Sequence, residues 1–164
     1  MNMLVFQYGS NISASRLNAA DRLNGGAKPV SLARTVANWL LAFEVWSATN
    51  KCAAANLRLG GTSPVWGRLY EIPDYLIDRN LAKRRNRKSL DQVEGEGKSY
   101  VRARIEVLPV GNKEPVQPMT YLAKTPRTGI RTSQEYVEHI LVGLAEVRCS
   151  PRLRRAPETG RTGE

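Results

Sequence analysis

The feature that most constrains this chain is a series of short β-prone segments separated by turn-forming residues. Residues 4–8 form a short apolar run, and residues 100–107 alternate between apolar and polar side chains, as a strand with one buried face does. Turn signals such as residues 60–64 stand between the segments, and short turns favour antiparallel pairing. Strands are predicted at residues 4–8, 38–46, 52–59, 65–72, 100–107 and 116–123.

Two of these segments carry a complication. The alanines of residues 52–59 are ambiguous for a strand, and Pro118 predicts an edge position or a bulge in the last strand. In residues 100–107 the alternation is regular enough to assign faces. One face is expected to carry Val101, Ala103, Ile105 and Val107, and the other Tyr100, Arg102, Arg104 and Glu106.

Helical patterns flank the strands. Residues 12–23 have a loose helical spacing of apolar residues that Gly25 and Gly26 would end, and a helical excursion lies between residues 72 and 90. A late helix begins with Thr132 and Glu135 in capping-box spacing. Its predicted apolar stripe comprises Val137, Ile140, Leu141 and Leu144. We therefore expect an α+β fold with a mixed, mainly antiparallel sheet of about six strands, curled or closed into a small barrel, with flanking helices.

Composition predicts one domain. The 164 residues carry a net charge of +10, concentrated in residues 82–88 and in the tail 150–164. The tail is poor in apolar residues and is expected to be disordered, so we place the domain at residues 1–149. The charge could attract nucleic acid or another polyanion. Because no aromatic residue interleaves the basic cluster and no nucleic-acid motif occurs, the pattern favours a solvated helix face and a loose tail.

Other features argue against several classes of protein. No apolar run is long enough to cross a membrane, and the N-terminal residues lack the pattern of a signal peptide. Cys52 and Cys149 are far apart and form neither a CxxC motif nor a zinc-ligand spacing. We therefore expect a cytoplasmic protein with reduced thiols and no bound metal.

The stretch Tyr8-Gly9-Ser10-Asn11 follows the first predicted strand and precedes a predicted helix. Glycine lets a ligand approach the backbone closely, and N–H groups near a helix N-terminus attract anions. The stretch therefore fits a pocket for a carboxylate or a phosphate. An ordinary strand-to-helix turn, with Ser10 or Asn11 as the N-cap, explains it equally well.

A second informative stretch surrounds Glu94. Its carboxyl group follows the apolar residues Leu90 and Val93 and precedes Gly95. Apolar surroundings disfavour the charged form of a carboxyl group, which suits a general acid or base near neutral pH. The alternative is a surface glutamate beside a C-cap glycine. Asp91 and Glu96 are expected to point elsewhere.

Taken in order, several segments resemble the γ-glutamylcyclotransferase family. The segments are VFQYGSN, NWLLAFEVWS, PVWGRLYEI, SLDQVEGEGKSYVRARIEV, MTYLA and RTSQEYVEHILVGL, and the resemblance spans roughly residues 3–145. Each motif alone is weak, but the ordered set is specific. The resemblance implies the family's fold and the release of 5-oxoproline from a γ-glutamyl compound by attack of the substrate's own α-amine on its γ-carbonyl.

The resemblance also implies residue roles. Glu94 matches the catalytic general acid/base, and the loop Tyr8, Gly9, Ser10 and Asn11 matches the substrate-binding loop. Three further tyrosines match substrate-contacting positions, although packing within the fold explains the first two equally well: Tyr100, Tyr121 and Tyr136. No cofactor, metal or covalent nucleophile is implied. His139, the only histidine, is interpreted as a packing or surface residue.

The chain also departs from the family. Residues 73–89 are longer than the corresponding connection in many relatives, Thr132-Ser133 stands where relatives often carry Pro-Ser, and the usual turn after Gly143 is replaced. The expected partner is a small γ-glutamyl substrate, with the protein a monomer or homodimer. Two alternatives stay open. One is an inactive binding module whose basic segments contact an acidic partner, and the other is a transferase that removes a γ-glutamyl protecting group.

Overall fold

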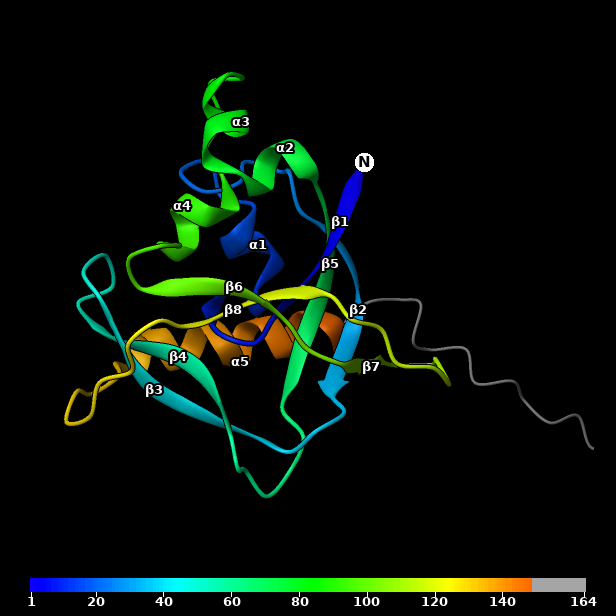
Figure 1. Ribbon diagram of the computed structural model, residues 1–164, viewed down its shortest axis with the longest axis vertical. Coiled ribbons are helices and arrows are strands. Elements are labelled where there is room, and N and C mark those ends of the chain that lie inside the picture. The colour runs from blue at the N-terminus through cyan, green and yellow to red at the C-terminus, as the bar shows by residue number, and fades with distance from the viewer. Residues whose placement is uncertain (149–164) are drawn as a thin grey trace, which may run out of the picture.

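The computed structural model describes residues 1–148, which form a mixed six-stranded sheet, a separate two-stranded sheet and helices, with α2, α3 and α4 grouped at the top of Figure 1. The strands are β1 (Asn2–Gln7), β2 (Lys28–Thr35), β3 (Trp39–Ser47), β4 (Cys52–Leu59), β5 (Trp66–Pro73), β6 (Tyr100–Arg104), β7 (Val107–Pro109) and β8 (Met119–Ala123). The helices are the 3₁₀ turn η1 (Ser10–Ile12) and α1 (Ala14–Leu17), α2 (Asp74–Ile77), α3 (Arg79–Lys83), α4 (Leu90–Glu94) and α5 (Gln134–Arg148). Cys149 and the tail 150–164 lie outside the described residues.

The main sheet has the strand order β6-β8-β1-β5-β2-β7. Strand β1 pairs antiparallel with β5 and parallel with β8, and the remaining pairs are antiparallel. The predicted α+β class with a mixed, mainly antiparallel sheet is therefore confirmed. Within residues 1–148 the sheet does not close into a barrel, because its two edge strands, β6 and β7, do not pair with each other.

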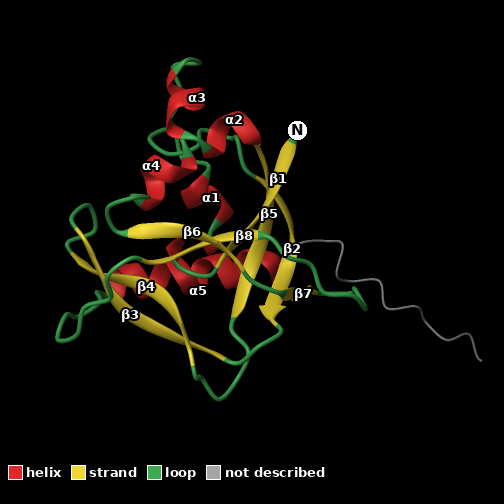
Figure 2. Ribbon diagram, viewed as in Figure 1, coloured by secondary structure: helices red, strands yellow, loops and turns green. Residues whose placement is uncertain are grey.

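The alanine-rich segment is a strand of the second sheet. Strand β4 pairs with β3 as a hairpin and is buried over its first six residues (Figure 2). Side chains as small as alanine let other elements pack against both faces of a strand. The Asn56 side chain crosses to the main sheet, where its Oδ1 accepts a hydrogen bond of 2.8 Å from the backbone of Ala123.

The early helix is shorter than predicted. Only η1 and the four residues of α1 are helical, and residues 18–26 form an irregular loop. The Asn18 side chain stabilises this loop by bonding both the N–H and the carbonyl of Ala27, at 2.8 Å each. Strand β2 was not predicted, because its first half contains Pro29 and is exposed, with an irregular register at Pro29/Ser31.

The predicted faces of residues 100–107 are only partly correct. Ile105 and Val107 are buried as expected, but Tyr100 is 7% exposed and Val101 is 38% exposed. The Tyr100 hydroxyl donates a hydrogen bond of 2.6 Å to the carbonyl of Ala55, so the ring points into the core. The segment breaks after Arg104 into β6 and β7, and the departures from the predicted faces are at Tyr100 and Val101, where the segment begins.

The late helix is present with a different cap and stripe. The Tyr136 N–H donates to Ser133 Oγ at 3.1 Å, so Ser133 and not Thr132 caps α5. Ile140 is buried as predicted, whereas Leu141 is 58% exposed. Gly143 lets α5 approach the backbone at Ser13 closely, because a Cβ at this position would lie 2.4 Å from the backbone nitrogen of Ser13.

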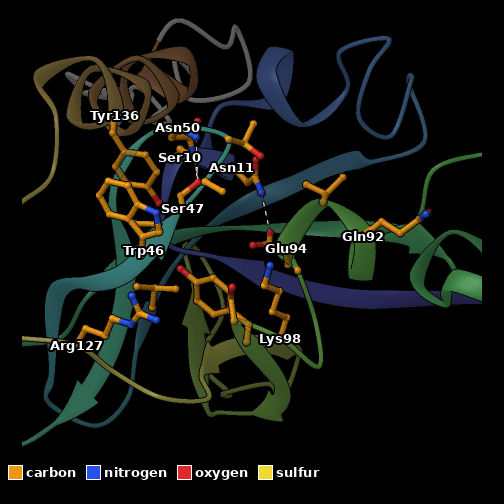
Figure 3. A pocket seen from close by; sticks show the side chains of 18 of the residues that line it. Ser10, Asn11, Trp46, Ser47, Asn50, Gln92, Glu94, Lys98, Arg127 and Tyr136 are labelled. Atoms are coloured by element: carbon orange, nitrogen blue, oxygen red, sulfur yellow. Dashed lines mark hydrogen bonds between the residues drawn. The ribbon is translucent and has the colours of Figure 1, made fainter. Parts of the chain in front are cut away.

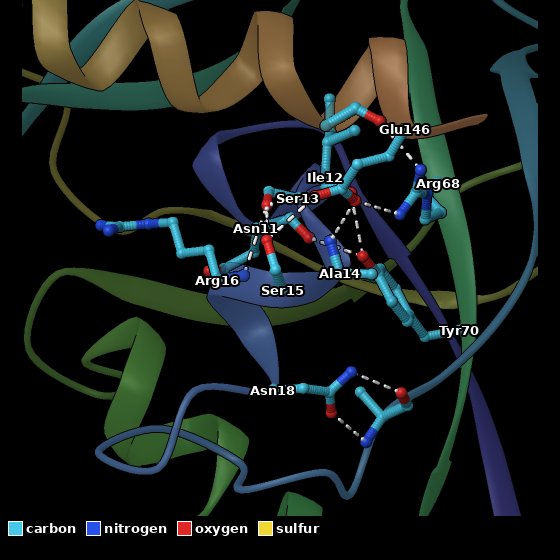
Figure 4. A network of polar contacts seen from close by, with 12 residues as sticks. Asn11, Ile12, Ser13, Ala14, Ser15, Arg16, Asn18, Arg68, Tyr70 and Glu146 are labelled. Atoms are coloured by element: carbon cyan, nitrogen blue, oxygen red, sulfur yellow. Dashed lines mark hydrogen bonds and ion pairs between the residues drawn. The ribbon is translucent and has the colours of Figure 1, made fainter. Parts of the chain in front are cut away.

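A polar network fastens α5 to α1 (Figure 4). The Glu146 carboxylate accepts hydrogen bonds from Ser13, Ser15 and the Ala14 N–H, at 2.8 to 3.0 Å. Buried Arg68 of β5 donates to the same carboxylate at 2.9 Å and to the Gly143 carbonyl at 2.8 Å. The network therefore joins the end of α5, the start of α1 and the middle of the sheet.

In the described part of the chain, no helix combines the length and the apolar character that crossing a membrane requires.

Candidate functional site

The predicted site residues surround two adjoining hollows. The outer cavity has a volume of about 460 Å³ and lies between the loop after β1, the β3–β4 turn, α4, the loop after β8 and α5. The inner pocket, about 30 Å³, opens beside it. Five of the predicted residues line both: Ser10, Asn11, Glu94, Tyr100 and Tyr136. The inner pocket adds the other three: Tyr8, Gly9 and Tyr121.

Glu94 is positioned by a short, well-capped helix. Ser89 and Gln92 form a complete capping box at the start of α4. Gly95 ends the helix in the left-handed conformation, with φ of 69°, which a glycine adopts without strain. The last residue of α4 therefore presents its carboxyl group at the wall that the outer cavity and the inner pocket share.

Asn11 contacts the Glu94 carboxyl group directly. Its Nδ2 donates to Glu94 Oε1 at 2.7 Å, and Figure 3 shows the two side chains facing each other. Burial raises the pKa of Glu94, while the Asn11 hydrogen bond and the positive charge of Arg22 oppose that rise. The net direction is upward, so the carboxyl group holds its proton to a higher pH than an exposed glutamate does.

Arg22 is a member of this site that the sequence did not indicate. Its guanidinium donates to Asn11 Oδ1 at 2.7 Å, which leaves the Asn11 amide nitrogen directed at Glu94. Arg22 lies in the irregular loop 18–26, where no local motif marks a functional residue. Only the contact across the fold shows its connection with Glu94.

The loop after β1 contacts two buried tyrosines, Tyr70 and Tyr136. The buried Tyr70 hydroxyl lies 3.1 Å from the carbonyl of Asn11 and 2.9 Å from that of Ile12, and its single proton is shared between these two acceptors. A Cβ on Gly9 would lie 3.0 Å from the Tyr136 hydroxyl. The helix N-terminus that was predicted here is a single 3₁₀ turn without a side-chain cap, and Ser13 rather than Ser10 or Asn11 caps α1.

The four tyrosines differ in what their hydroxyl groups bind. Three donate to protein atoms: Tyr8 to the Tyr121 carbonyl at 2.6 Å, Tyr100 to the Ala55 carbonyl at 2.6 Å, and Tyr121 to Asp91 at 2.8 Å. The Tyr136 hydroxyl instead accepts from the Ala55 N–H at 3.0 Å, which leaves its proton available. Burial raises the pKa of all four, so they stay neutral at physiological pH.

Asp91 does not line either hollow, as expected, but it is not a surface residue. It is 3% exposed, and its Oδ1 accepts from Arg102 Nε at 3.0 Å as well as from Tyr121. Arg102 forms a second hydrogen bond with Asp91 Oδ2. The pair therefore holds the Tyr121 hydroxyl in place without lining either hollow.

The remaining candidates lie away from the cavity. His139 pairs with Arg16 at 3.2 Å, and burial together with the charge of Arg16 lowers its pKa. Among the described residues, no three His, Cys, Asp or Glu side chains come together as metal ligands.

The basic cluster 82–88 has structural contacts and does not line the cavity. Arg87 donates to the carbonyls of Leu23 and Asn24 at 2.7 and 3.1 Å, and Lys88 donates to the carbonyl of Asp21 at 3.0 Å. These contacts fasten the loop that carries Arg22. Part of the positive charge therefore stabilises the fold around the site.

Comparison with known proteins gives consistent results. A search of curated proteins found no match. A solved structure titled gamma-glutamyl cyclotransferase shares 22% identity with a TM-score of 0.73, over 100% of this chain and 95% of that one. An uncharacterized protein from Homo sapiens shares 22% with a TM-score of 0.72, over 99% and 92% of the two chains. An aig2-like protein from Mus musculus shares 19% with a TM-score of 0.55, over 98% and 99%.

These structures show a shared fold, and the sequence itself matches a family. The sequence pattern of the family described as gamma-glutamyl cyclotransferase, AIG2-like, matches residues 5–138. That span includes the loop after β1, all of α4 and the first residues of α5. The chain therefore belongs to the gamma-glutamyl cyclotransferase, AIG2-like family.

Proposed function

We propose that the protein is a cyclotransferase that releases 5-oxoproline from a γ-glutamyl amino acid or γ-glutamyl amine, with Glu94 as general acid and base. The observation that carries the proposal is the Glu94 carboxyl group, partly buried, bonded by Asn11 at 2.7 Å and open to a cavity of about 460 Å³. Family membership supports a γ-glutamyl substrate.

The reaction needs one group that both takes and gives a proton. The substrate's α-amine attacks its own γ-carbonyl carbon, a new C–N bond closes the five-membered ring, and Glu94 takes the proton that the attacking nitrogen loses. The bond from the same carbon to the second amine then breaks, and Glu94 returns the proton to that leaving nitrogen. The products are 5-oxoproline and the free amine, and no water is consumed.

Holding the substrate in a folded-back conformation supplies much of the expected rate gain, because the attack is intramolecular. We assign the α-carboxylate of the substrate to the backbone N–H groups of the loop at Gly9, Ser10 and Asn11. Tyr136, whose hydroxyl proton is uncommitted, is assigned as a donor to the substrate. Tyr100, Tyr121 and Tyr8 form the wall of the inner pocket.

A 5-oxoproline release assay on the purified protein tests the proposal. The panel is γ-glutamyl-alanine, γ-glutamyl-ε-lysine and glutathione. We expect release from at least one of them, because the proton transfer assigned to Glu94 is the same whichever amine leaves. No release from any, by protein with a cooperative thermal transition, would overturn the proposal and favour a binding module of the same fold.

The pH profile of kcat/KM is a further expected consequence. Glu94 must be ionised to take the proton, so kcat/KM should rise with pH through its pKa, which burial raises above the usual 4.5. Arg22 lowers that pKa, so Arg22→Gln should shift the acid limb to higher pH. The measurement is kcat/KM against pH at constant ionic strength, with Lys113→Gln as the control. An acid limb that does not move, or moves to lower pH, would contradict this role of Arg22.

A further inference from the structure

The outer cavity carries three positive side chains that face one acid. Arg22, Lys98 and Arg127 line it, and among its lining residues Glu94 is the only carboxylate. The three cations come from different parts of the chain: the loop before β2, the turn between α4 and β6, and the loop after β8. Within the described residues, none of the three forms an ion pair.

The cations are confined to one of the two hollows. The inner pocket is lined by the loop after β1, Ala55, Glu94 and the tyrosines, and contains no lysine or arginine. The outer cavity contains all three. In Figure 3, Lys98 and Arg127 lie on the side of Glu94 opposite Asn11 and Asn50. A substrate whose γ-glutamyl group is held by the loop at Gly9–Asn11 would therefore extend its second amine toward the cations.

Unpaired cations around a cavity raise its potential and favour anionic ligands. One of the three, Arg22, already bonds Asn11, and its Nε has no hydrogen-bond partner among the described residues. Lys98 and Arg127 are exposed and have no acidic neighbour at hydrogen-bond distance in the described part of the chain. A cationic side chain on the leaving amino acid would be repelled here, and a neutral side chain would leave the α-carboxylate as its only negative group for the cations to bind.

We propose that the outer cavity selects γ-glutamyl compounds whose leaving amine is an acidic amino acid, with its side-chain carboxylate bound by Lys98 and Arg127. This inference rests on the proposed function for its assignment of the leaving group. It extends that function by naming the charge of the amine partner. The specificity arises from charge rather than from a shaped side-chain pocket, so it should weaken as salt is added.

The test compares two nearly isosteric substrates, γ-glutamyl-glutamate and γ-glutamyl-glutamine, which differ by one negative charge. We expect kcat/KM for the glutamate compound to be about five- to tenfold higher at low salt, a difference of about 1–1.4 kcal/mol, because ion pairs with exposed side chains such as Lys98 and Arg127 are each weak. The double variant Lys98→Gln/Arg127→Gln should reduce this ratio toward one. Lys113→Gln and Arg34→Gln remove charges that do not line the cavity and should leave the ratio unchanged.

Binding separates a failure of this inference from a failure of the proposed function. Calorimetry with the Glu94→Gln variant measures the affinity of each compound without turnover. Tighter binding of γ-glutamyl-glutamate, lost when Lys98→Gln and Arg127→Gln are added to Glu94→Gln, supports the acidic preference even if the wild-type protein releases no 5-oxoproline. Equal or weaker binding of γ-glutamyl-glutamate, or no binding of either compound, would overturn it.

Discussion

Glu94→Gln is expected to lower kcat/KM for 5-oxoproline release by about two to four orders of magnitude, the usual contribution of a positioned general acid/base. Glutamine keeps the size and the oxygen that accepts from Asn11 at 2.7 Å, but it cannot take or return a proton. The measurement is steady-state release of 5-oxoproline by wild type and variant at the same pH.

The fold of this variant should be intact, because the left-handed Gly95, and not the Glu94 side chain, ends α4. Circular dichroism and the thermal midpoint check that point. Glu96→Gln is the matched control, since Glu96 lies two residues away and lines neither hollow. It should retain activity. Turnover by Glu94→Gln within about tenfold of wild type would exclude Glu94 as the proton-transfer group.

Arg68→Met is expected to lower the free energy of unfolding by about 2–4 kcal/mol, somewhat less than breaking a fully buried ion pair costs, because Arg68 is buried while the Glu146 side chain is 26% exposed. Arg68 is 4% exposed and donates to the Glu146 carboxylate and to the Gly143 carbonyl. Both acceptors would lose a donor, although Glu146 keeps those of Ser13, Ser15 and Ala14. Chemical denaturation at neutral pH, with the slope compared between proteins, measures the loss.

Lys28→Met provides the contrast for this measurement. Its ion pair with Glu71 spans 3.5 Å and is solvent-exposed, with the lysine side chain 77% accessible. Exposed pairs contribute about 0–1 kcal/mol, so this variant should unfold at nearly the denaturant concentration of wild type. If Arg68→Met cost no more than Lys28→Met, the network joining α5 to α1 would not contribute to stability as argued.

Most of the strands that the sequence predicted correctly have clear local signals, although the ambiguous residues 52–59 also form a strand, β4. Residues 4–8, 38–46 and 65–72 combine apolar or β-branched side chains with flanking turns, and each contains most of a strand. Strand β2 lacked such a signal, because its proline-containing first half is exposed and is held in the sheet by long-range pairing with β5. The predicted face of Tyr100 was wrong for a related reason. A long-range hydrogen bond from its hydroxyl to the carbonyl of Ala55, which local alternation does not reveal, orients the ring.

The residues of the candidate site also fall into those with a local sequence signal and those without one. Glu94, Gly95 and the loop at Gly9–Asn11 were identified from contiguous residues whose spacing resembles the family. Arg22, Lys98 and Arg127 were not, because each lies in a loop without a motif and meets the others only across the fold. Asp91 was expected to point away, and its burial beneath Tyr121 follows from the placement of β6 and β8 side by side.

The sequence by itself determined the strand-rich α+β class, the family and the position of one carboxyl group at the end of a short helix. Each of these depends on residues close together in the chain, where spacing and turn chemistry act directly. The tertiary structure alone decided that the sheet stays open within residues 1–148, that Arg22 orients Asn11 toward Glu94, and that three cations share one cavity. Such contacts join residues far apart in sequence, and packing and long-range hydrogen bonds, rather than local preference, determine them.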